Sequence, residues 1–341
     1  MSEKKSLLSK NTLMITGISS IIIFIIGLIS IIPEVNLAYY SSSSAVRAIF
    51  KAITYLGEPV VFIVIIAILI LGYNKVTAKN LALSLLFSYY LNGLFKEIIQ
   101  DGRPPFNTDI TENLGVVESS YGFPSGHGQL AVAFWGYASY EFKDKYKYND
   151  IPVIPIILSV IIFLVAISRI VIGVHDLQDI VGALLLGVGF LIAYIYLEPI
   201  VTPHFNKLNL ITKLVMTVVV SFALFLIGTF LWPRAYVGLA TQNLPPNYSD
   251  AGAFGLVGGA LLGFGVGYLL EQEFVKYDPS SLSNKSKIIN VVIGIVILFV
   301  VFLPFEYLLE IDSAFYRFAR YTLVSFILTY VVPLICTKIN K

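Results

Sequence analysis

The sequence predicts an all-α polytopic membrane protein. Of its 341 residues, 57% are hydrophobic and 13% are charged, whereas a soluble globular chain carries roughly 25% charged residues. Apolar stretches of about 20 residues, the length that a helix needs to cross a bilayer, recur from one end of the chain to the other. Lysine and arginine gather in alternate connecting segments, as they do in chains that cross a membrane repeatedly.

Ten stretches are candidate membrane spans. The second and the fourth are short or carry polar residues, and the first follows three lysines. That first stretch is longer than the roughly 7–15 apolar residues of a signal peptide and lacks a small-residue cleavage site, so we expect it to remain as a span. The ten candidates are at about 12–32, 58–73, 80–99, 126–142, 152–172, 178–198, 211–232, 251–270, 287–308 and 314–336.

The distribution of basic residues predicts the orientation of the chain. With the N-terminus placed in the cytoplasm, 15 of the 23 lysines and arginines lie in cytoplasmic segments. Positive charge favours the cytoplasmic side of a membrane protein. We therefore expect both termini in the cytoplasm and the protein in the plasma membrane.

The segment between the first two spans is predicted to be helical, near residues 42–56. Apolar residues recur at helical spacing from Val46 to Leu56, while Arg47 and Lys51 lie on another face. This pattern indicates an interfacial helix on the outer surface. An ordinary connecting helix packed on protein is the alternative.

Four glycines of the eighth span, Gly255, Gly259, Gly263 and Gly267, recur at every fourth position. They lie on one face of a helix and allow another helix to approach closely. The partner helix could belong to a second copy, which would make a homodimer, or to the same chain, which is the simpler account. The net charge of +2 does not indicate a nucleic acid partner.

Three short segments gather most of the polar chemistry of this apolar chain. Because consecutive spans run in opposite directions, all three reach the outer membrane surface. Charged side chains within or beside a bilayer are costly and mark functional sites. The segments are Lys96 with Arg103-Pro104, then Pro124-Ser125-Gly126-His127, then Ser168-Arg169 with His175 and Asp179.

The residue types in these segments suit a phosphate group. Arg103 and Arg169 offer forked donors that match phosphate oxygens, and Lys96 adds a compact positive charge. Ser125 can donate a hydrogen bond through its hydroxyl. Gly126 lets the backbone approach a ligand without an intervening side chain.

Two histidines and an aspartate complete a set for phosphoryl transfer. His175 and Asp179 are four residues apart, so on a helix they would share a face. A carboxylate that accepts from one imidazole nitrogen leaves the other free to attack. His127 can then protonate the departing oxygen. This chemistry requires no metal or other cofactor, and three nearby cations would repel a metal ion.

The order and spacing of these motifs resemble the type 2 phosphatidic acid phosphatase (PAP2) superfamily, the membrane relatives of vanadium haloperoxidases. The resemblance implies a six-helix catalytic core over about 1–198 and leaves about four additional helices over 199–341. It also implies that His175 is the nucleophile and forms a phosphohistidine, with Asp179 as its partner and His127 as the acid. The residues that it implies for phosphate binding are Lys96, Arg103, Ser125, Gly126 and Arg169.

The expected function is metal-independent hydrolysis of lipid phosphates or diphosphates at the outer membrane face. Polyprenyl diphosphate, phosphatidic acid and phosphatidylglycerol phosphate are all compatible substrates, so the expected partner is a membrane lipid. A soluble phosphate ester is the alternative, because the glucose-6-phosphatase branch of the family also carries extra spans. A lipid transporter is a weaker interpretation, since transport sites tend to lie near the bilayer midplane. Glu58 could line the substrate entrance, but a solvated carboxylate at a helix start is the simpler interpretation.

Overall fold

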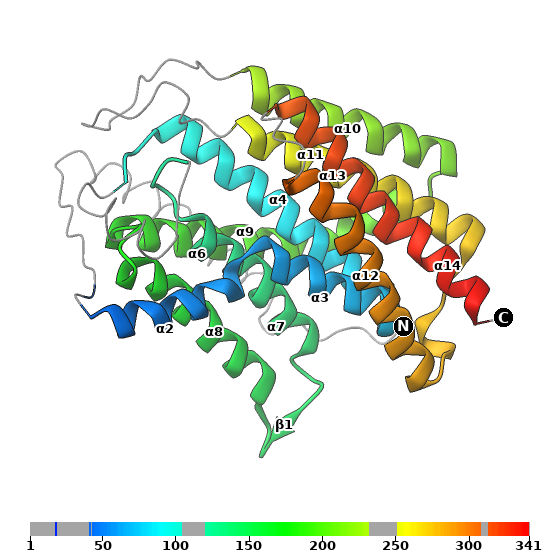
Figure 1. The fold of residues 1–341 in the computed structure, drawn as a ribbon, viewed down its shortest axis with the longest axis horizontal. Helices are drawn as coiled ribbons and strands as arrows, with labels where there is room; N and C mark the ends of the chain where they lie inside the picture. The colour runs from blue at the N-terminus through cyan, green and yellow to red at the C-terminus, as the bar shows by residue number, and fades with distance from the viewer. Residues whose placement is uncertain are drawn as a thin grey trace. The chain divides into compact units, whose positions relative to one another are not determined.

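The computed structural model describes residues 18, 41, 43–103, 120–231, 251–307 and 313–340. Nearly all of this part of the chain is helical (Figure 1), which confirms the predicted all-α polytopic membrane fold. Nine of the ten predicted spans coincide with helices. The first predicted span, 12–32, lies outside the described residues apart from Ile18, and Pro104 also lies outside them.

The described residues form the following elements, given in chain order. In the first half they are α2 (Ser44–Thr54), the 3₁₀ turn η1 (Tyr55–Gly57), α3 (Pro59–Gly72), α4 (Lys75–Ile99), α6 (Gly126–Ala131), the π-helical η2 (Val132–Gly136), α7 (Tyr137–Phe142), β1 (Lys147–Tyr148), β2 (Ile151–Pro152) and α8 (Val153–Val171). In the second half they are α9 (Leu177–Asn206), α10 (Leu210–Phe230), α11 (Ala251–Leu270), η3 (Glu271–Val275), η4 (Pro279–Ser281), α12 (Asn284–Tyr307), α13 (Ala314–Phe326), η5 (Ile327–Val331) and α14 (Val332–Ile339).

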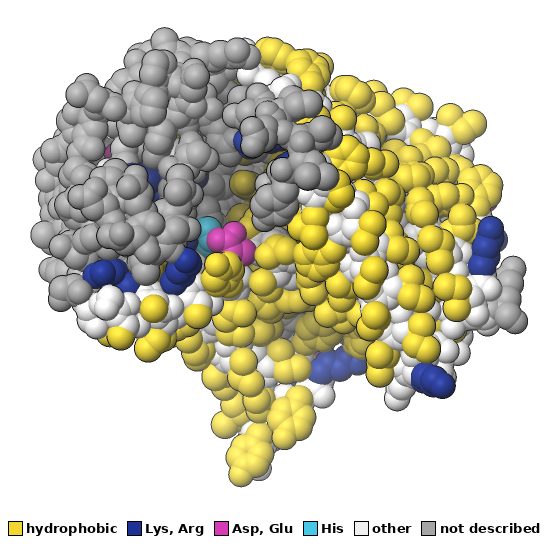
Figure 2. Space-filling model, viewed as in Figure 1, with side chains coloured by type: hydrophobic (Ala, Val, Ile, Leu, Met, Phe, Trp, Pro, Cys, Tyr) yellow, Lys and Arg dark blue, Asp and Glu magenta, His cyan; other side chains and the backbone are white. Residues whose placement is uncertain are grey.

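Six helices of the described residues are long and apolar enough to cross a membrane. These six spans start at the first residues of α8, α9, α10, α12 and α13 and at residue 253 in α11. A bent pair of helices, 44–57 and 59–72, with 45° between its halves, can be counted as a seventh span. The predicted spans at 58–73, 80–99 and 126–142 are helical but are not among these six helices. For the first of the three, the reason is length, because α3 has only 14 residues. Exposed hydrophobic side chains cover much of the described surface (Figure 2), as expected of a protein surrounded by lipid.

Two compact units divide the chain, and they do not follow its order. The first unit contains residues 1–61, 94–203 and 234–249, and the second contains 62–93, 204–233 and 250–341. Helices α3 and α4 each contribute residues to both units. In the first unit, α2 packs along α8, as do α6 and α7. The helix predicted near 42–56 is thus present as α2 and is in contact with protein on one side.

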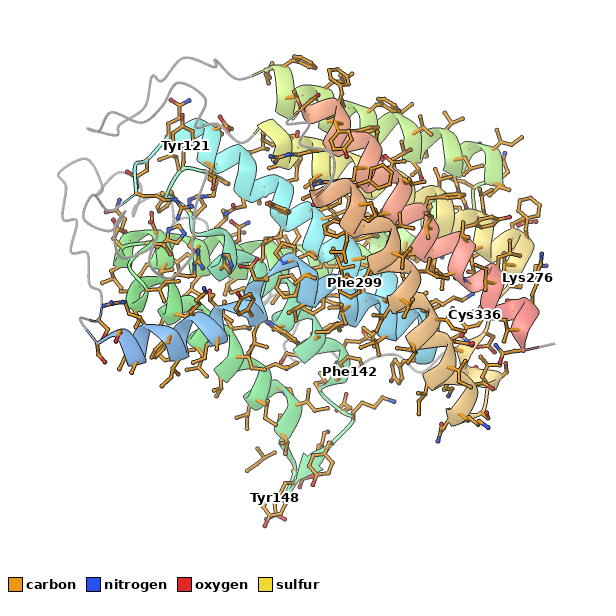
Figure 3. The ribbon with its side chains drawn as sticks, viewed as in Figure 1. Tyr121, Phe142, Tyr148, Lys276, Phe299 and Cys336 are labelled. Atoms are coloured by element: carbon orange, nitrogen blue, oxygen red, sulfur yellow. The ribbon has the colours of Figure 1, made fainter. Side chains whose placement is uncertain are left out.

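A small hairpin joins α7 to α8 in the first unit. Strands β1 and β2 pair antiparallel, and Tyr148 lies near the tip (Figure 3). The two turn residues, Asn149 and Asp150, have φ values of 47° and 62°. Left-handed backbone at both central positions is the geometry of a two-residue hairpin turn, and asparagine and aspartate tolerate it well.

The glycine face of α11 packs against α13 and η5 within the second unit. A Cβ atom at Gly255, Gly259 or Gly263 would lie 2.3, 2.1 or 2.0 Å from the backbone carbonyl oxygen of Ala314, Phe318 or Thr322, respectively. At Gly267 it would lie 2.1 Å from Oγ1 of Thr329. Packing within one chain therefore accounts for the glycine spacing. A homodimer through this face stays a prediction.

Polar contacts hold α3 and α4 to the C-terminal helices inside the second unit. Nζ of Lys75 donates to both carboxylate oxygens of Glu271, at 2.9 and 2.8 Å. The backbone N–H of Tyr277 donates to Glu271 at 2.7 Å, and its hydroxyl donates to the carbonyl of Leu71 at 2.5 Å. Burial raises the pKa of Tyr277 to about 12. Its hydroxyl therefore stays protonated and keeps donating at neutral pH.

Candidate functional site

The three predicted motifs converge within the first unit. The site is built from the last turn of α4, the segments 101–103 and 120–125, the last turn of α8 and the loop that leads into α9. The starts of α6 and α9 are adjacent, because the backbone N–H of Ser125 donates to the carbonyl of Asp179 at 3.2 Å. Segments that are up to 83 positions apart along the sequence therefore meet in one site. The alternating directions of the predicted spans led us to expect this.

His175 and Asp179 form a buried pair. Nδ1 of His175 lies 2.7 Å from Oδ2 of Asp179, and each side chain is 1% exposed. The sequence placed both residues on one helix, but His175 lies in the loop before α9 and only Asp179 belongs to its first turn. The loop reverses after α8 at Gly173, whose φ of 85° favours glycine. The expected pairing is present although its helical premise is wrong.

Arg103 contacts the other nitrogen of the same ring. Its Nη1 lies 3.1 Å from Nε2 of His175 and donates to the carbonyl of Val174 at 2.9 Å. An arginine can only donate, and an ionised Asp179 can only accept. These partners favour a neutral ring with its proton on Nδ1 and a lone pair on Nε2.

Electrostatics favour the same neutral form. Burial holds the pKa of His175 well below its ordinary value, and the positive charges of Arg103, Lys96 and Arg169 lower it further. A neutral imidazole is the form that can act as a nucleophile. The site therefore keeps Nε2 available for attack at neutral pH.

Lys96 and Arg169 are buried beside this ring. Nζ of Lys96 donates to the backbone carbonyl of Tyr121 (labelled in Figure 3) and lies 3.4 Å from that of Gly122. Lys96 thus braces the segment that leads to Ser125, a role that the sequence did not indicate. Arg169 is 1% exposed, and its Nη1 donates to Oγ1 of Thr54 in α2 at 2.9 Å.

Ser125 and Gly126 lie where α6 begins. Ser125 is fully buried, and its Oγ makes no hydrogen bond within the part of the chain that the structure describes. Unsatisfied buried hydroxyls are uncommon, and such a group is suited to bond a ligand or a water molecule. This hydroxyl fits the predicted role of a donor to phosphate.

His127 contacts a residue outside the three motifs. Its Nε2 lies 3.0 Å from Oε1 of Glu58, at the junction of η1 and α3. The expectation of a merely solvated carboxylate at position 58 is therefore wrong. The available signal was a lone acidic residue between Gly57 and Pro59 at the start of an apolar run. No spacing rule connected it to His127, which lies 69 positions further on.

The arrangement brings together groups that suit phosphoryl transfer. A neutral imidazole is held by a carboxylate, a second imidazole lies close enough for its charge to act on the first, and three cations surround them. Positive charge placed in advance stabilises the oxygens of a transferring phosphoryl group. The structure brings together all the site residues predicted from the sequence and adds Glu58 beside His127.

Two parts of the chain match family models of known proteins. Residues 77–203 match the family model described as the PAP2 superfamily, and residues 256–341 match "PAP2 superfamily phosphatase, transmembrane extension". Phosphatidylglycerophosphatase B of Bacillus subtilis (strain 168) is 32% identical over 41% of this chain and 68% of its own length. The crystal structure of a transmembrane PAP2-type phosphatidylglycerolphosphate phosphatase from Bacillus subtilis covers 54% of this chain and 96% of its own, with 24% identity and a TM-score of 0.46.

Proposed function

Because the chain belongs to the PAP2 superfamily and is a lipid phosphate phosphatase of that type, we propose that it cleaves its substrate through a phosphohistidine on His175. The observation that carries this proposal is the chain of contacts from Asp179 through the ring of His175 to Arg103, at 2.7 and 3.1 Å. It presents Nε2 of His175 where a guanidinium can hold the phosphate oxygens.

In the first half-reaction Nε2 of His175 attacks phosphorus. The P–N bond forms while the bond to the leaving oxygen breaks, and His127 gives that oxygen a proton. Asp179 stabilises the positive charge that develops on the ring of His175. Lys96, Arg103 and Arg169 stabilise the charge on the three remaining phosphate oxygens.

In the second half-reaction a water molecule attacks the phosphohistidine. His127, now neutral, takes a proton from that water, and the P–N bond breaks to release inorganic phosphate. His175 returns to its neutral form and His127 to its protonated form. The cycle balances with water as the only co-substrate.

The proposed substrate is a lipid phosphate or diphosphate at the extracytoplasmic face of the plasma membrane. Phosphatidylglycerol phosphate is the first candidate, because the relative from Bacillus subtilis is named as a phosphatase of that lipid. Phosphatidic acid and polyprenyl diphosphate fit the same chemistry. The additional C-terminal helices gave the soluble-phosphate alternative its support, but residues 256–341 of this part match a transmembrane extension of PAP2 phosphatases.

The test is phosphate release by the purified protein in detergent with EDTA present. The panel contains phosphatidylglycerol phosphate, phosphatidic acid, a polyprenyl diphosphate and glucose 6-phosphate. We expect turnover of at least one lipid, and a loss of at least about 10³-fold in His175→Ala. His204→Ala is the matched control, because this exposed histidine lies near the end of α9, and it should keep wild-type turnover.

Radiolabelled lipid phosphate should leave acid-labile label on the wild-type protein and none on His175→Ala. Retained turnover in His175→Ala would remove the nucleophile assignment. Loss of turnover on adding EDTA would contradict the metal-independent chemistry. Preferential hydrolysis of glucose 6-phosphate would replace the lipid by a soluble substrate.

A further inference from the structure

Glu58 lies against the ring of His127 because Gly57 allows the backbone to come close. A Cβ atom at position 57 would lie 2.7 Å from Cγ1 of Val165 and 3.0 Å from Cδ2 of His127. Without a side chain there, η1 can pass beside the ring and turn into α3. The next residue then places Oε1 of Glu58 at 3.0 Å from Nε2 of His127.

The two histidines of the site are each held by a carboxylate, but at opposite ring nitrogens. Asp179 contacts Nδ1 of His175, whereas Glu58 contacts Nε2 of His127. The pairs also differ in burial, because His175 and Asp179 are each 1% exposed whereas His127 is 16% and Glu58 34% exposed. A carboxylate near water keeps its charge more easily than a fully buried one.

We propose that Glu58 is a positioning residue that holds His127 as the proton donor for the leaving group. This inference rests on the proposed function, in which His127 is the acid. A carboxylate oxygen accepts the hydrogen bond from Nε2–H and fixes the ring orientation. The ring then presents Nδ1 to the leaving oxygen.

The charge of Glu58 also favours the protonated imidazole that an acid requires. His175 acts in the opposite sense, because the positive charge of His127 lowers the pKa of His175 and this repulsion between the two rings is mutual. Glu58 offsets this repulsion from the side of η1. In the proposed step, the proton on Nδ1 of His127 moves to the oxygen as its bond to phosphorus breaks. The proton on Nε2 stays donated to Glu58.

The test is the dependence of kcat/KM on the leaving group. This quantity reports the steps up to release of the leaving group and excludes the later hydrolysis of the phosphohistidine, in which His127 also acts. An alkyl phosphate, such as a short-chain phosphatidic acid, needs a proton on its leaving oxygen, whereas a dinitrophenyl phosphate releases a stable phenolate without one. In His127→Ala we expect the alkyl ester to slow by about 10²–10⁴-fold and the aryl ester to change little. In Glu58→Gln we expect the alkyl ester to slow by roughly 10–100-fold, as for carboxylates that orient metal-binding histidines, with the aryl ester within about twofold.

Two further variants separate positioning from a general structural effect. The double variant Glu58→Gln, His127→Ala should be no slower than His127→Ala alone, because residues that act as one unit are not additive. Thr54→Val is the matched control from the same segment, since it removes a contact to Arg169 and leaves His127 alone. It should slow both esters by the same factor.

Equal slowing of both esters by Glu58→Gln, or no slowing at all, would overturn the inference while leaving the proposed function intact. A further loss in the double variant would also overturn it. If His127→Ala itself slowed both esters equally, the assignment of His127 as the acid would fail, and the role of Glu58 would fail with it.

Discussion

At the scale of single residues, the site depends on which imidazole nitrogen each partner holds. Nδ1 of His175 is 2.7 Å from Asp179, and Nε2 is 3.1 Å from Arg103. Replacing the carboxylate by an amide would keep the shape but offer a donor as readily as an acceptor. The ring could then carry its proton on Nε2, where it cannot attack phosphorus.

For Asp179→Asn we therefore expect kcat to fall by roughly 10²–10⁴-fold, as when a comparable aspartate loses its hold on a histidine tautomer. The measurement is steady-state phosphate release together with the thermal midpoint of the variant. Asp176→Asn is the control, because Oδ1 of Asp176 accepts from the backbone of Asp179 and does not contact the ring. An Asp179→Asn enzyme as fast as Asp176→Asn would show that the tautomer is set by other groups.

The cations around His175 predict a shift in the pH profile. They help to lower the pKa of His175, so the ring becomes protonated and inactive only at a pH well below the ordinary pKa of histidine. Arg103→Gln removes one of these charges and should raise the pKa. At a given acid pH a larger fraction of the molecules then has a protonated His175. The acid limb of kcat/KM should therefore move to higher pH, and the rate should also fall at every pH.

The substrate's own ionisation is the same for every variant and cannot produce that difference. Arg47→Gln is a suitable control, because Arg47 bonds the carbonyl of Ser41 and is not among the charges that lower the pKa of His175. Acid limbs that coincide in the wild type and Arg103→Gln would mean that another group controls the profile.

At the scale of elements, the contact between α11 and α13 depends on missing side chains. A methyl group at Gly263 would meet the carbonyl oxygen of Thr322 at 2.0 Å, and a helix backbone cannot move aside without shifting the whole helix. At Gly265 the nearest atom, at 2.6 Å, is the side-chain methyl group of Thr217. It can move by rotation about χ1 at the cost of one hydrogen bond, from Oγ1 to the carbonyl of Lys213. The same substitution to alanine in α11 therefore meets backbone at position 263 and a side chain at position 265.

We expect Gly263→Ala to lower stability by about 1–3 kcal/mol, the usual cost of overpacking, and Gly265→Ala to cost clearly less. Thermal unfolding in detergent, followed by circular dichroism, measures the difference. Equal midpoints for the two variants would show that α13 can retreat from α11, and the close approach would not be a determinant of stability.

The sequence predicted the elements better than their details. Long apolar runs located nine helical stretches, most of them to within a few residues, because hydrophobic length is a strong signal. Alternating spans also predicted that Arg103, Arg169 and His175 would meet. Nothing local, however, revealed that Lys96 would brace Tyr121 or that Glu58 would reach His127. Those contacts depend on how α4 and η1 pack, which no periodicity encodes.

At the scale of the whole molecule, the side of the membrane that bears the site is a prediction from the basic residues. Ser44 at the start of α2 is predicted to lie outside and Tyr148 in the hairpin inside, and both are exposed. In a Cys336→Ala background, we expect a membrane-impermeant maleimide to label Ser44→Cys on intact cells. Tyr148→Cys should react only after the cells are lysed. The reverse pattern would invert the orientation and place the site in the cytoplasm.

The network around Glu271 bears on how the protein can be divided. Lys75 in α4 is tied to Glu271, and Tyr90 of the same helix packs edge-on against Phe254 of α11, with ring centroids 5.4 Å apart. A chain that stopped after Asn206 would leave Lys75 without Glu271 and would expose Tyr90. Helix α4, whose last turn carries Lys96, would lose these stabilising contacts. Removing residues 207–341 should therefore destabilise α4 and the folded enzyme, even though none of the removed residues is proposed to contact the substrate.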